Sequence, residues 1–209
     1  EIEIPRGGEF DLVLADGTQV WLNAESRLRY PVEFSGKERK VVLEGEAYFQ
    51  VKKNPSLPFR VEIRNQVIEV LGTEFNVSGY KDEVHVYTTL VNGKVKVATT
   101  GRDMTLLPGE QCVLDTGDGS MIRQQVDVDK IISWKKGKFI LEEQTLEQIM
   151  QKLARWYDIT VFYQNPALKN KVFKGSVPRY AELQQVLNIL EKTGEVQFHI
   201  QNRTVIVKE

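Results

Sequence analysis

The amino-acid sequence predicts an all-β N-terminal domain, residues 1–125, followed by a small α+β C-terminal domain, residues 126–209. Through the first domain, apolar residues alternate with polar ones, which is the period of a half-buried strand. After about residue 126 the apolar spacing lengthens to three and four, which is the period of an amphipathic helix. A chain of 209 residues is long enough for two domains that each bury a core.

The first domain contains many short alternating runs separated by turn signals. Asn92-Gly93 is the strongest hairpin signal among them, because both central residues of a type I′ turn need a positive φ. The spacing of the runs favours an antiparallel sandwich, barrel or roll. The predicted strands are FDLVLAD, KVVLEGEAYFQVKK, FRVEI, QVIEVLG, EFNVSGY, EVHVYTTLV, KVKVAT and QCVLD.

The second domain contains two predicted helices among short strands. TLEQIMQKLARWYD carries one apolar face and begins near Thr145, and AELQQVLNILEKTG carries another and stops at Gly194. The predicted strands are KGKFILEE, ITVFYQ, KVFKGSV, VQFHI and TVIVKE.

The second domain also repeats itself at one constant offset. Each copy is a predicted strand, helix and strand, so the sequence predicts two split βαβ units. In the first copy the matched residues are Leu146, Ile149, Leu153, Ile159 and Val161, and in the second they are Leu183, Val186, Leu190, Val196 and Phe198.

Two similar stretches, LADGTQVWLN and VLGTEFNVSG, place a Gly-Thr pair before an apolar-rich run, at Gly17-Thr18 and Gly72-Thr73. A phosphate-binding glycine loop follows a strand and opens a helix, whereas both of these pairs open predicted strands. We therefore interpret them as turns that lead into strands, where glycine supplies unusual backbone dihedrals.

Composition excludes several classes of protein. Apolar residues at 41% and charged residues at 27% are globular values, and a net charge of -1 argues against a nucleic-acid-binding protein. The single cysteine, Cys112, cannot form an intrachain disulfide and is expected to be buried.

No stretch of the sequence approaches the about 18 to 20 consecutive apolar residues that a membrane-spanning helix needs. The chain begins abruptly with EIEIPRGGEF, which we interpret as the start of a portion excised from a longer protein.

No catalytic, cofactor-binding or metal-binding residue is assigned. His85 and His199 lie far apart in separate predicted strands, without partners for a metal. The spacing of the carboxylates selects no acid/base pair. Trp21, Trp134 and Trp156 are candidates for a sugar platform, although Trp21 and Trp156 lie in apolar-periodic contexts that favour core packing. The carboxylates considered are Asp16, Glu44, Glu46, Asp115 and Asp118.

Long ordered motifs carry a resemblance to a known family. EIEIPRGGEFDLVLADGTQVWLNAESRLRYPVEF, RKVVLEGEAYFQVKKNPSLPFRVEI, VIEVLGTEFNVSGY and LLPGEQCVL resemble the periplasmic region of FecR-family anti-sigma factors, in the form abundant in Bacteroidetes. The remainder, from SWKKGKFILEE to VQFHI, is similar to the C-terminal domain that accompanies it. That domain is related in shape to the N-terminal signalling fold of secretins and TonB-dependent receptors.

The resemblance implies a sensor and no enzyme or cofactor. The whole protein would have a cytoplasmic segment that holds an extracytoplasmic-function (ECF) sigma factor, and one inner-membrane helix, both outside this sequence. This portion would lie in the periplasm. It would receive a signal from the N-terminal signalling domain of a TonB-dependent outer-membrane receptor.

The last predicted strand is the candidate partner-binding segment. An exposed sheet edge accepts a partner strand through main-chain hydrogen bonds, and the final strand is a candidate for such an edge. An internal or merely solvated strand is the alternative. The predicted partner-binding residues are Arg203, Thr204, Val205, Ile206, Val207 and Lys208.

Two other functions remain open at this point. A carbohydrate- or polymer-binding periplasmic module would show exposed aromatic side chains on a flat sheet face. A glycoside-active enzyme would show a deep pocket with converging carboxylates.

Overall fold

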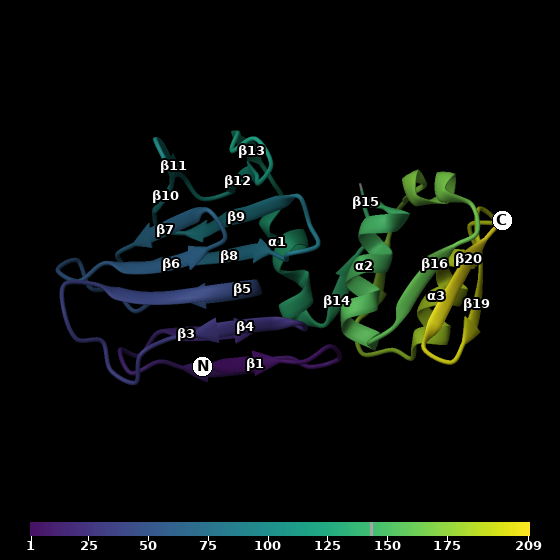
Figure 1. The fold of residues 1–209 in the computed structure, drawn as a ribbon, viewed down its shortest axis with the longest axis horizontal. Helices are drawn as coiled ribbons and strands as arrows, with labels where there is room; N and C mark the ends of the chain where they lie inside the picture. Colours follow the sequence, from purple (N-terminus) through teal and green to yellow (C-terminus); the bar gives the residue numbers. More distant parts are fainter. Residues whose placement is uncertain (143) are drawn as a thin grey trace. The chain divides into compact units, whose positions relative to one another are not determined.

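The computed structural model describes residues 1–142 and 144–209. They form an N-terminal unit, Glu1–Ile132, and a C-terminal unit, Ser133–Glu209 (Figure 1). The N-terminal unit is mostly β and the C-terminal unit mixes helices with strands, so the predicted fold class is confirmed.

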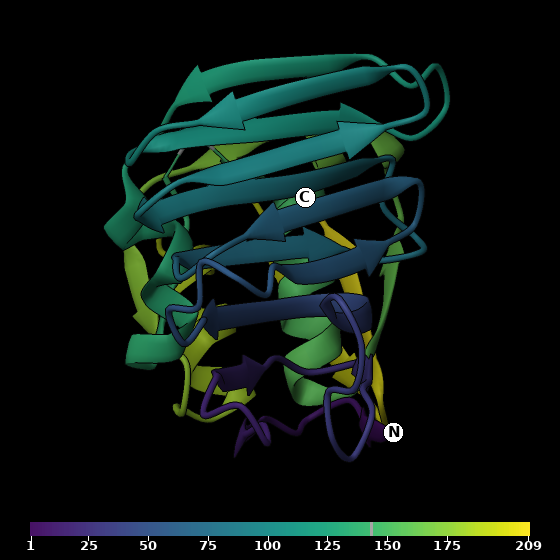
Figure 2. The same cartoon turned by 90° about the vertical axis from the view of Figure 1, so that its left-hand side faces the viewer.

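Two sheets build the N-terminal unit, and both contain strand β5 (Arg39–Gln50). In Figure 2 the strands of this unit run across the view, from purple near the N-terminus to teal. The first sheet has the order β1 (Ile2–Ile4), β4 (Ser26–Arg29), β5, β6 (Phe59–Ile63), β7 (Gln66–Val70), β10 (Val95–Thr99) and β11 (Arg102–Leu106). The second has the order β2 (Phe10–Val13), β3 (Gln19–Leu22), β5, β8 (Glu74–Gly79), β9 (His85–Asn92), β12 (Glu110–Asp115) and β13 (Met121–Gln125).

Strand β5 changes sheet at Gly45. Its residues before Gly45 pair with β4 and β6, and its residues from Gly45 onward pair with β3 and β8. Gly45 has a φ of 92°, and a Cβ there would lie 2.8 Å from the Cα of Ser26. Only glycine fits this bend, because other residues avoid this φ and carry a Cβ.

The bend brings the two ends of β5 together around Arg39. Twelve extended residues would span roughly 40 Å, yet the Arg39 side chain, at the start of β5, donates to the Lys52 carbonyl, just past its end, over 2.8 Å. The same guanidinium group donates to Asp16 over 2.7 Å and to the Leu57 carbonyl over 2.9 Å. Arg39 is 1% exposed, so its Nε and Nη1 atoms make these hydrogen bonds away from water, while its Nη2 atom is buried without a hydrogen-bond partner.

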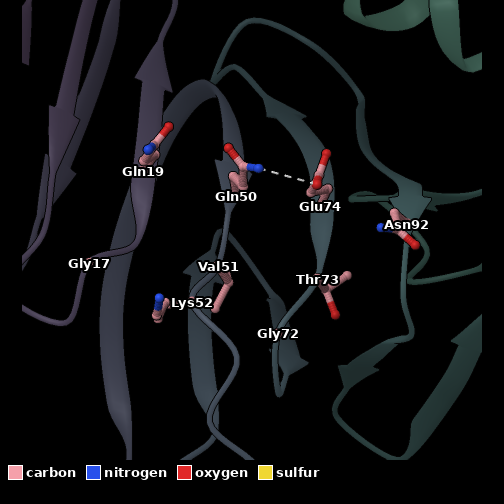
Figure 3. A pocket seen from close by; sticks show the side chains of 9 residues that line it. All are labelled: Gly17, Gln19, Gln50, Val51, Lys52, Gly72, Thr73, Glu74 and Asn92. Atoms are coloured by element: carbon pink, nitrogen blue, oxygen red, sulfur yellow. Dashed lines mark hydrogen bonds between the residues drawn. The ribbon is translucent and has the colours of Figure 1, made fainter.

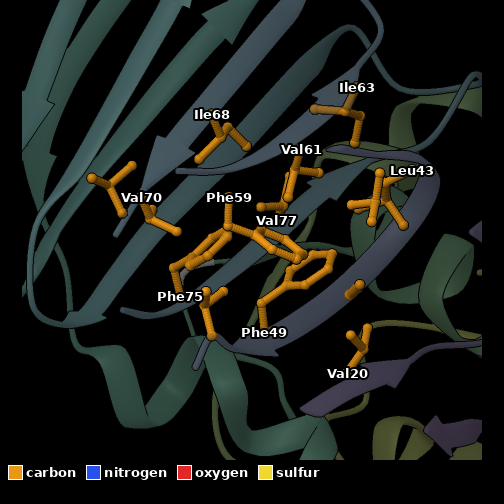
Figure 4. Close-up of a cluster of buried hydrophobic side chains, with 14 of the residues drawn as sticks. Val20, Leu43, Phe49, Phe59, Val61, Ile63, Ile68, Val70, Phe75 and Val77 are labelled. Carbon is orange, nitrogen blue, oxygen red and sulfur yellow. The ribbon is translucent and has the colours of Figure 1, made fainter. Parts of the chain in front are cut away.

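Aromatic side chains fill the space between the two sheets. Phe49 stacks on Phe75 with ring centroids 5.2 Å apart and lies 6.0 Å from Phe59 (Figure 4). All three are fully buried in one apolar core. Because Phe49 and Phe75 belong to the second sheet and Phe59 to the first, this cluster joins the two sheets directly.

The predicted Asn92-Gly93 hairpin is wrong. Strand β9 pairs with β8 and β12, whereas β10 pairs with β7 and β11, so this turn carries the chain from one sheet to the other. Gly93 has a φ of 100°, but Asn92 is not among the residues with positive φ, so the turn is not type I′.

In the C-terminal unit, helices α2 (Leu146–Tyr157) and α3 (Leu183–Glu191) share one core with short strands of separate sheets. The first strands of the two repeated copies, β14 (Lys138–Ile140) and β18 (Ser176–Pro178), pair with each other. The second strands, β16 (Thr160–Tyr163) and β19 (Gln197–Gln201), flank β20 (Thr204–Lys208).

The remaining elements are α1 (Val128–Ile131) in the N-terminal unit, the 3₁₀ helices η1 (Ile132–Lys136) and η2 (Pro166–Asn170), and the paired β15 (Gln144–Thr145) and β17 (Val172–Phe173).

Thr145 caps α2, so the helix begins where the sequence predicts, near this residue. The Thr145 hydroxyl accepts from the Gln148 amide over 3.3 Å, and the Gln148 side chain accepts from the Thr145 amide over 2.9 Å. This reciprocal capping box satisfies two amide groups that would otherwise lack partners at the helix start.

The prediction that the last strand forms a sheet edge is wrong. Strand β20 is the middle strand of three, parallel to β16 and antiparallel to β19. Val205 and Val207 are fully buried, so the strand needs sheet on both sides to complete the core. Strand addition at residues 203–208 is therefore excluded, and proline at Val205 would disrupt the unit itself.

Replacement of Gly45 by alanine tests the bend of β5. We expect Gly45→Ala to lower the free energy of unfolding by about 3 kcal/mol or more, because backbone strain adds to the clash with Ser26. Gly36 is the control, since its φ is 123° and no atom lies within 4 Å of the added Cβ. Gly36→Ala should cost only about 1 kcal/mol of backbone strain. Equal losses for both variants in urea unfolding would contradict this account of Gly45.

Candidate functional site

The three-stranded sheet of the C-terminal unit has one face against the core and one face turned outward. Val161, Phe198, Val205 and Val207 belong to the core side. The alternate residues of the same strands lie on the opposite side, which we call the open face. It consists of Thr160, Phe162, Gln197, His199, Gln201, Thr204, Ile206 and Lys208.

A row of two apolar residues and one histidine crosses the centre of the open face. Phe162 lies opposite Ile206 on one side, and His199 lies opposite Ile206 on the other. Phe162 is 58% exposed and His199 is also exposed. Thr160, Thr204 and Gln201 form a neighbouring polar row. An apolar centre with a polar rim is the usual anatomy of a protein-binding patch.

Only half of the predicted partner-binding residues lie on this face. Thr204, Ile206 and Lys208 do, whereas Val205 and Val207 are buried. Arg203 lies beside the strand, where it pairs with the Asp158 carboxylate and donates to the Asp158 carbonyl over 3.0 Å. Whether these residues bind a partner stays a prediction.

Phe162 and His199 are not among the residues predicted from the sequence to bind a partner. The signal was present, because the two residues occupy equivalent positions in the two copies of the repeat and flank the last strand symmetrically. The strand order that joins them through Ile206 depends on distant pairing and is not visible in the local pattern.

Candidate catalytic groups have structural partners instead. Among the described residues, no three histidine, cysteine, aspartate or glutamate side chains group as metal ligands. His85 lies 3.5 Å from Asp115, and Asp16 is held by Arg39. Glu46 accepts from Asn23 over 2.7 Å and from Asn76 over 3.0 Å.

The remaining candidate carboxylates are also committed to local contacts. A hydrogen bond from Lys81 holds the pKa of Glu44 below its usual value. The amide and hydroxyl of Ser120 lower the pKa of Asp118 by hydrogen bonding to its carboxylate. These two groups are therefore ionised structural partners, poorly suited to hold a catalytic proton.

The tryptophans do not form a flat aromatic platform. Trp21 is half-buried and packs edge-on against Tyr48, with centroids 5.6 Å apart. Trp134 is 6% exposed. The Trp156 ring lies 3.9 Å from the guanidinium carbon of Arg179, a cation–π contact. Core packing of Trp21 and Trp156 was the expectation that the sequence favoured.

Both Gly-Thr pairs lead into strands, as the sequence predicts, and their threonines fix the turns. The Thr18 hydroxyl donates to Asp16 over 2.7 Å and accepts from the Lys52 amide over 3.1 Å. The Thr73 hydroxyl donates to the Lys94 carbonyl over 3.0 Å. Both threonines are buried, so their hydroxyl groups fix the conformation of the turns and are not available to a ligand.

Comparison with known proteins agrees with these two units. The family model described as FecR protein matches residues 1–96, and the model described as FecR, C-terminal, matches residues 138–207. Two crystal structures of a proposed anti-sigma factor from Parabacteroides distasonis ATCC 8503 superpose with TM-scores of 0.92 and 0.91, at 27% and 28% identity. They cover 100% of this chain and 98% and 97% of theirs. No curated protein matches significantly.

The matches over both units place the chain in a class of regulatory proteins. The chain belongs to the FecR family of anti-sigma factors, membrane sensors with periplasmic domains that regulate sigma factors. The described chain contains no helix with the length and apolarity of a membrane span.

The thiol of Cys112 provides a test of the N-terminal core. Burial raises its pKa to about 11, and the side chain is fully buried. We expect iodoacetamide at pH 8 to leave the native chain unlabelled and to modify one thiol after unfolding in urea, because the unfolded thiol has a pKa of about 8.5. Rapid labelling of the native chain would contradict this burial.

The same shift has a pH consequence. The buried thiol stays protonated where the unfolded thiol already ionises, so the free energy of unfolding falls as the pH rises from about 8.5 towards 11.

Proposed function

We propose that this chain is the periplasmic sensor region of an inner-membrane anti-sigma factor. It receives a signal from the N-terminal signalling domain of a TonB-dependent outer-membrane receptor. Through a cytoplasmic segment of the whole protein, it controls an ECF sigma factor. The observation that carries the proposal is the row of Phe162, Ile206 and His199 on the open face.

The row has the properties of a binding centre. Phe162 and Ile206 present apolar surface beside each other, and His199 extends the row with a flat ring. A group of adjacent exposed apolar side chains indicates a binding surface, whereas a single exposed one does not. Aromatic side chains near the centre of a patch contribute most to binding in protein interfaces.

The outer face of the first sheet is a poorer docking surface. Its exposed charges are paired across neighbouring strands, so a partner would have to displace existing ion pairs. The pairs are Arg27–Glu3, Lys40–Glu62, Arg60–Glu69 and Lys96–Asp103, with separations between 2.6 and 2.9 Å. Of the other exposed apolar residues, Val32, Val84 and Leu107 lie singly in loops.

A charge at the centre of the open face tests the proposal. We expect Phe162→Asp to weaken binding of the cognate receptor's N-terminal domain by at least about 30-fold in calorimetry, because a hot-spot aromatic is lost and a carboxylate is desolvated. Phe162 is exposed, so the variant should keep its melting temperature within a few degrees.

Ile189→Asp is the matched control. Ile189 is 41% exposed on α3, outside the open face. This variant should bind like the unmodified chain. Unchanged binding by Phe162→Asp, or equal loss by both variants, would refute the assignment of the open face.

A further inference from the structure

The two Gly-Thr turns meet at one end of the second sheet and frame a polar pocket of about 320 Å³ (Figure 3). Gly17 lines it from the turn before β3, and Gly72 lines it from the turn before β8. Between them the chain passes through Lys52, directly after β5. The volume lies at the lower end of the range of small-molecule sites.

Four side chains form one row across this pocket. Gln19 lies opposite Gln50, Gln50 opposite Glu74, and Glu74 opposite Asn92, on four neighbouring strands. Residues directly opposite each other on a sheet point to the same side. The row therefore places three amides and a carboxylate side by side along one line of the sheet, and Figure 3 shows Gln50 and Glu74 joined by a hydrogen bond.

Much of the hydrogen-bonding capacity of this row is unused. Within residues 1–142 and 144–209, the side chains of Gln19, Lys52 and Asn92 make no hydrogen bond or ion pair. Glu74 is oriented by the Tyr48 hydroxyl over 2.8 Å and by the Gln50 amide over 3.3 Å. The pocket thus offers free donors and acceptors beside one fixed carboxylate.

Two close contacts hold the frame of the pocket together. A Cβ at Gly72 would lie 2.5 Å from the Lys53 Cα, so the chain after β5 passes directly over this glycine. The Val51 amide donates to the Thr73 carbonyl over 3.0 Å, which joins the two turns through the segment between them. Because these groups are already in place, ligand binding carries little entropic cost for ordering the protein.

The pocket's chemistry selects among ligand classes. The positive charge of Lys52 and the negative charge of Glu74 cancel within the lining, which favours a ligand without net charge. Each of β3, β5, β8 and β9 is paired on both sides, so no strand edge is open to an extended peptide here. Val51, 6% exposed, is the apolar side chain of the lining, which leaves no pocket for an apolar group.

We propose that this pocket binds a neutral saccharide of one or two sugar rings, whose hydroxyl groups pair with Gln19, Gln50, Glu74 and Asn92. Hydroxyl groups both donate and accept, as do side-chain amides, so they can satisfy this row together. The site lies within the N-terminal unit and is independent of the docking proposed for the open face.

The test is a titration of the full 209-residue chain with maltose and with N,N′-diacetylchitobiose, followed by nuclear magnetic resonance of the side-chain amides. For a dissociation constant of about 1 mM, sugar up to about 10 mM nearly saturates the site. We expect saturable shifts for Gln19, Gln50 and Asn92, and none for Gln197, an exposed amide on β19.

Two variants and a matched control sharpen the result. Gln19→Ala and Asn92→Ala should each weaken binding about three- to tenfold, because each removes one or more hydrogen bonds. Gln197→Ala, which removes an exposed amide on β19 of the C-terminal unit, should leave binding unchanged. The proposal fails if neither sugar gives saturable shifts at the pocket amides, if Gln197 shifts equally, or if both pocket variants bind like the unmodified chain.

Discussion

The bend of β5 at Gly45 is the constraint on which the N-terminal unit depends. One strand serves two sheets, so the sheets can enclose a common core only where the chain turns sharply without a Cβ. The buried Arg39 clasp then joins the start of β5 to the segment after its end, and places Asp16 and the first Gly-Thr turn beside Lys52. The polar pocket is therefore a product of the same bend that closes the core.

The C-terminal unit is built on repetition. Two similar strand–helix–strand copies place their first strands together and leave a gap between their second strands, which β20 fills. That insertion buries Val205 and Val207 and turns Ile206 outward between Phe162 and His199. The open face thus arises from equivalent positions of both copies, joined by a strand that belongs to neither.

Features that depend on local sequence were predictable, and features that depend on distant pairing were not. Period two and period 3.6 identified strands and helices, and Thr145 marked a helix start because a capping box is a local device. Asn92-Gly93 misled, because the core assigns β9 and β10 to different sheets whatever the turn between them. The edge position of β20 misled for the same reason, and with it Phe162 and His199 were missed. The convergence of Gly17 and Gly72 on one pocket likewise needed the strand order.

We propose that the N-terminal unit supplies the scaffold and the small-ligand site, and that partner docking belongs to the open face of the C-terminal unit. The most direct measurement is methyl nuclear magnetic resonance of the isoleucines in complex with the receptor's N-terminal domain. We expect the Ile206 methyl resonance to shift on binding, while those of Ile122 on β13 and Ile189 on α3, both exposed, do not. A complex that forms with Ile206 unperturbed, or with its largest shift at Ile122, would contradict it.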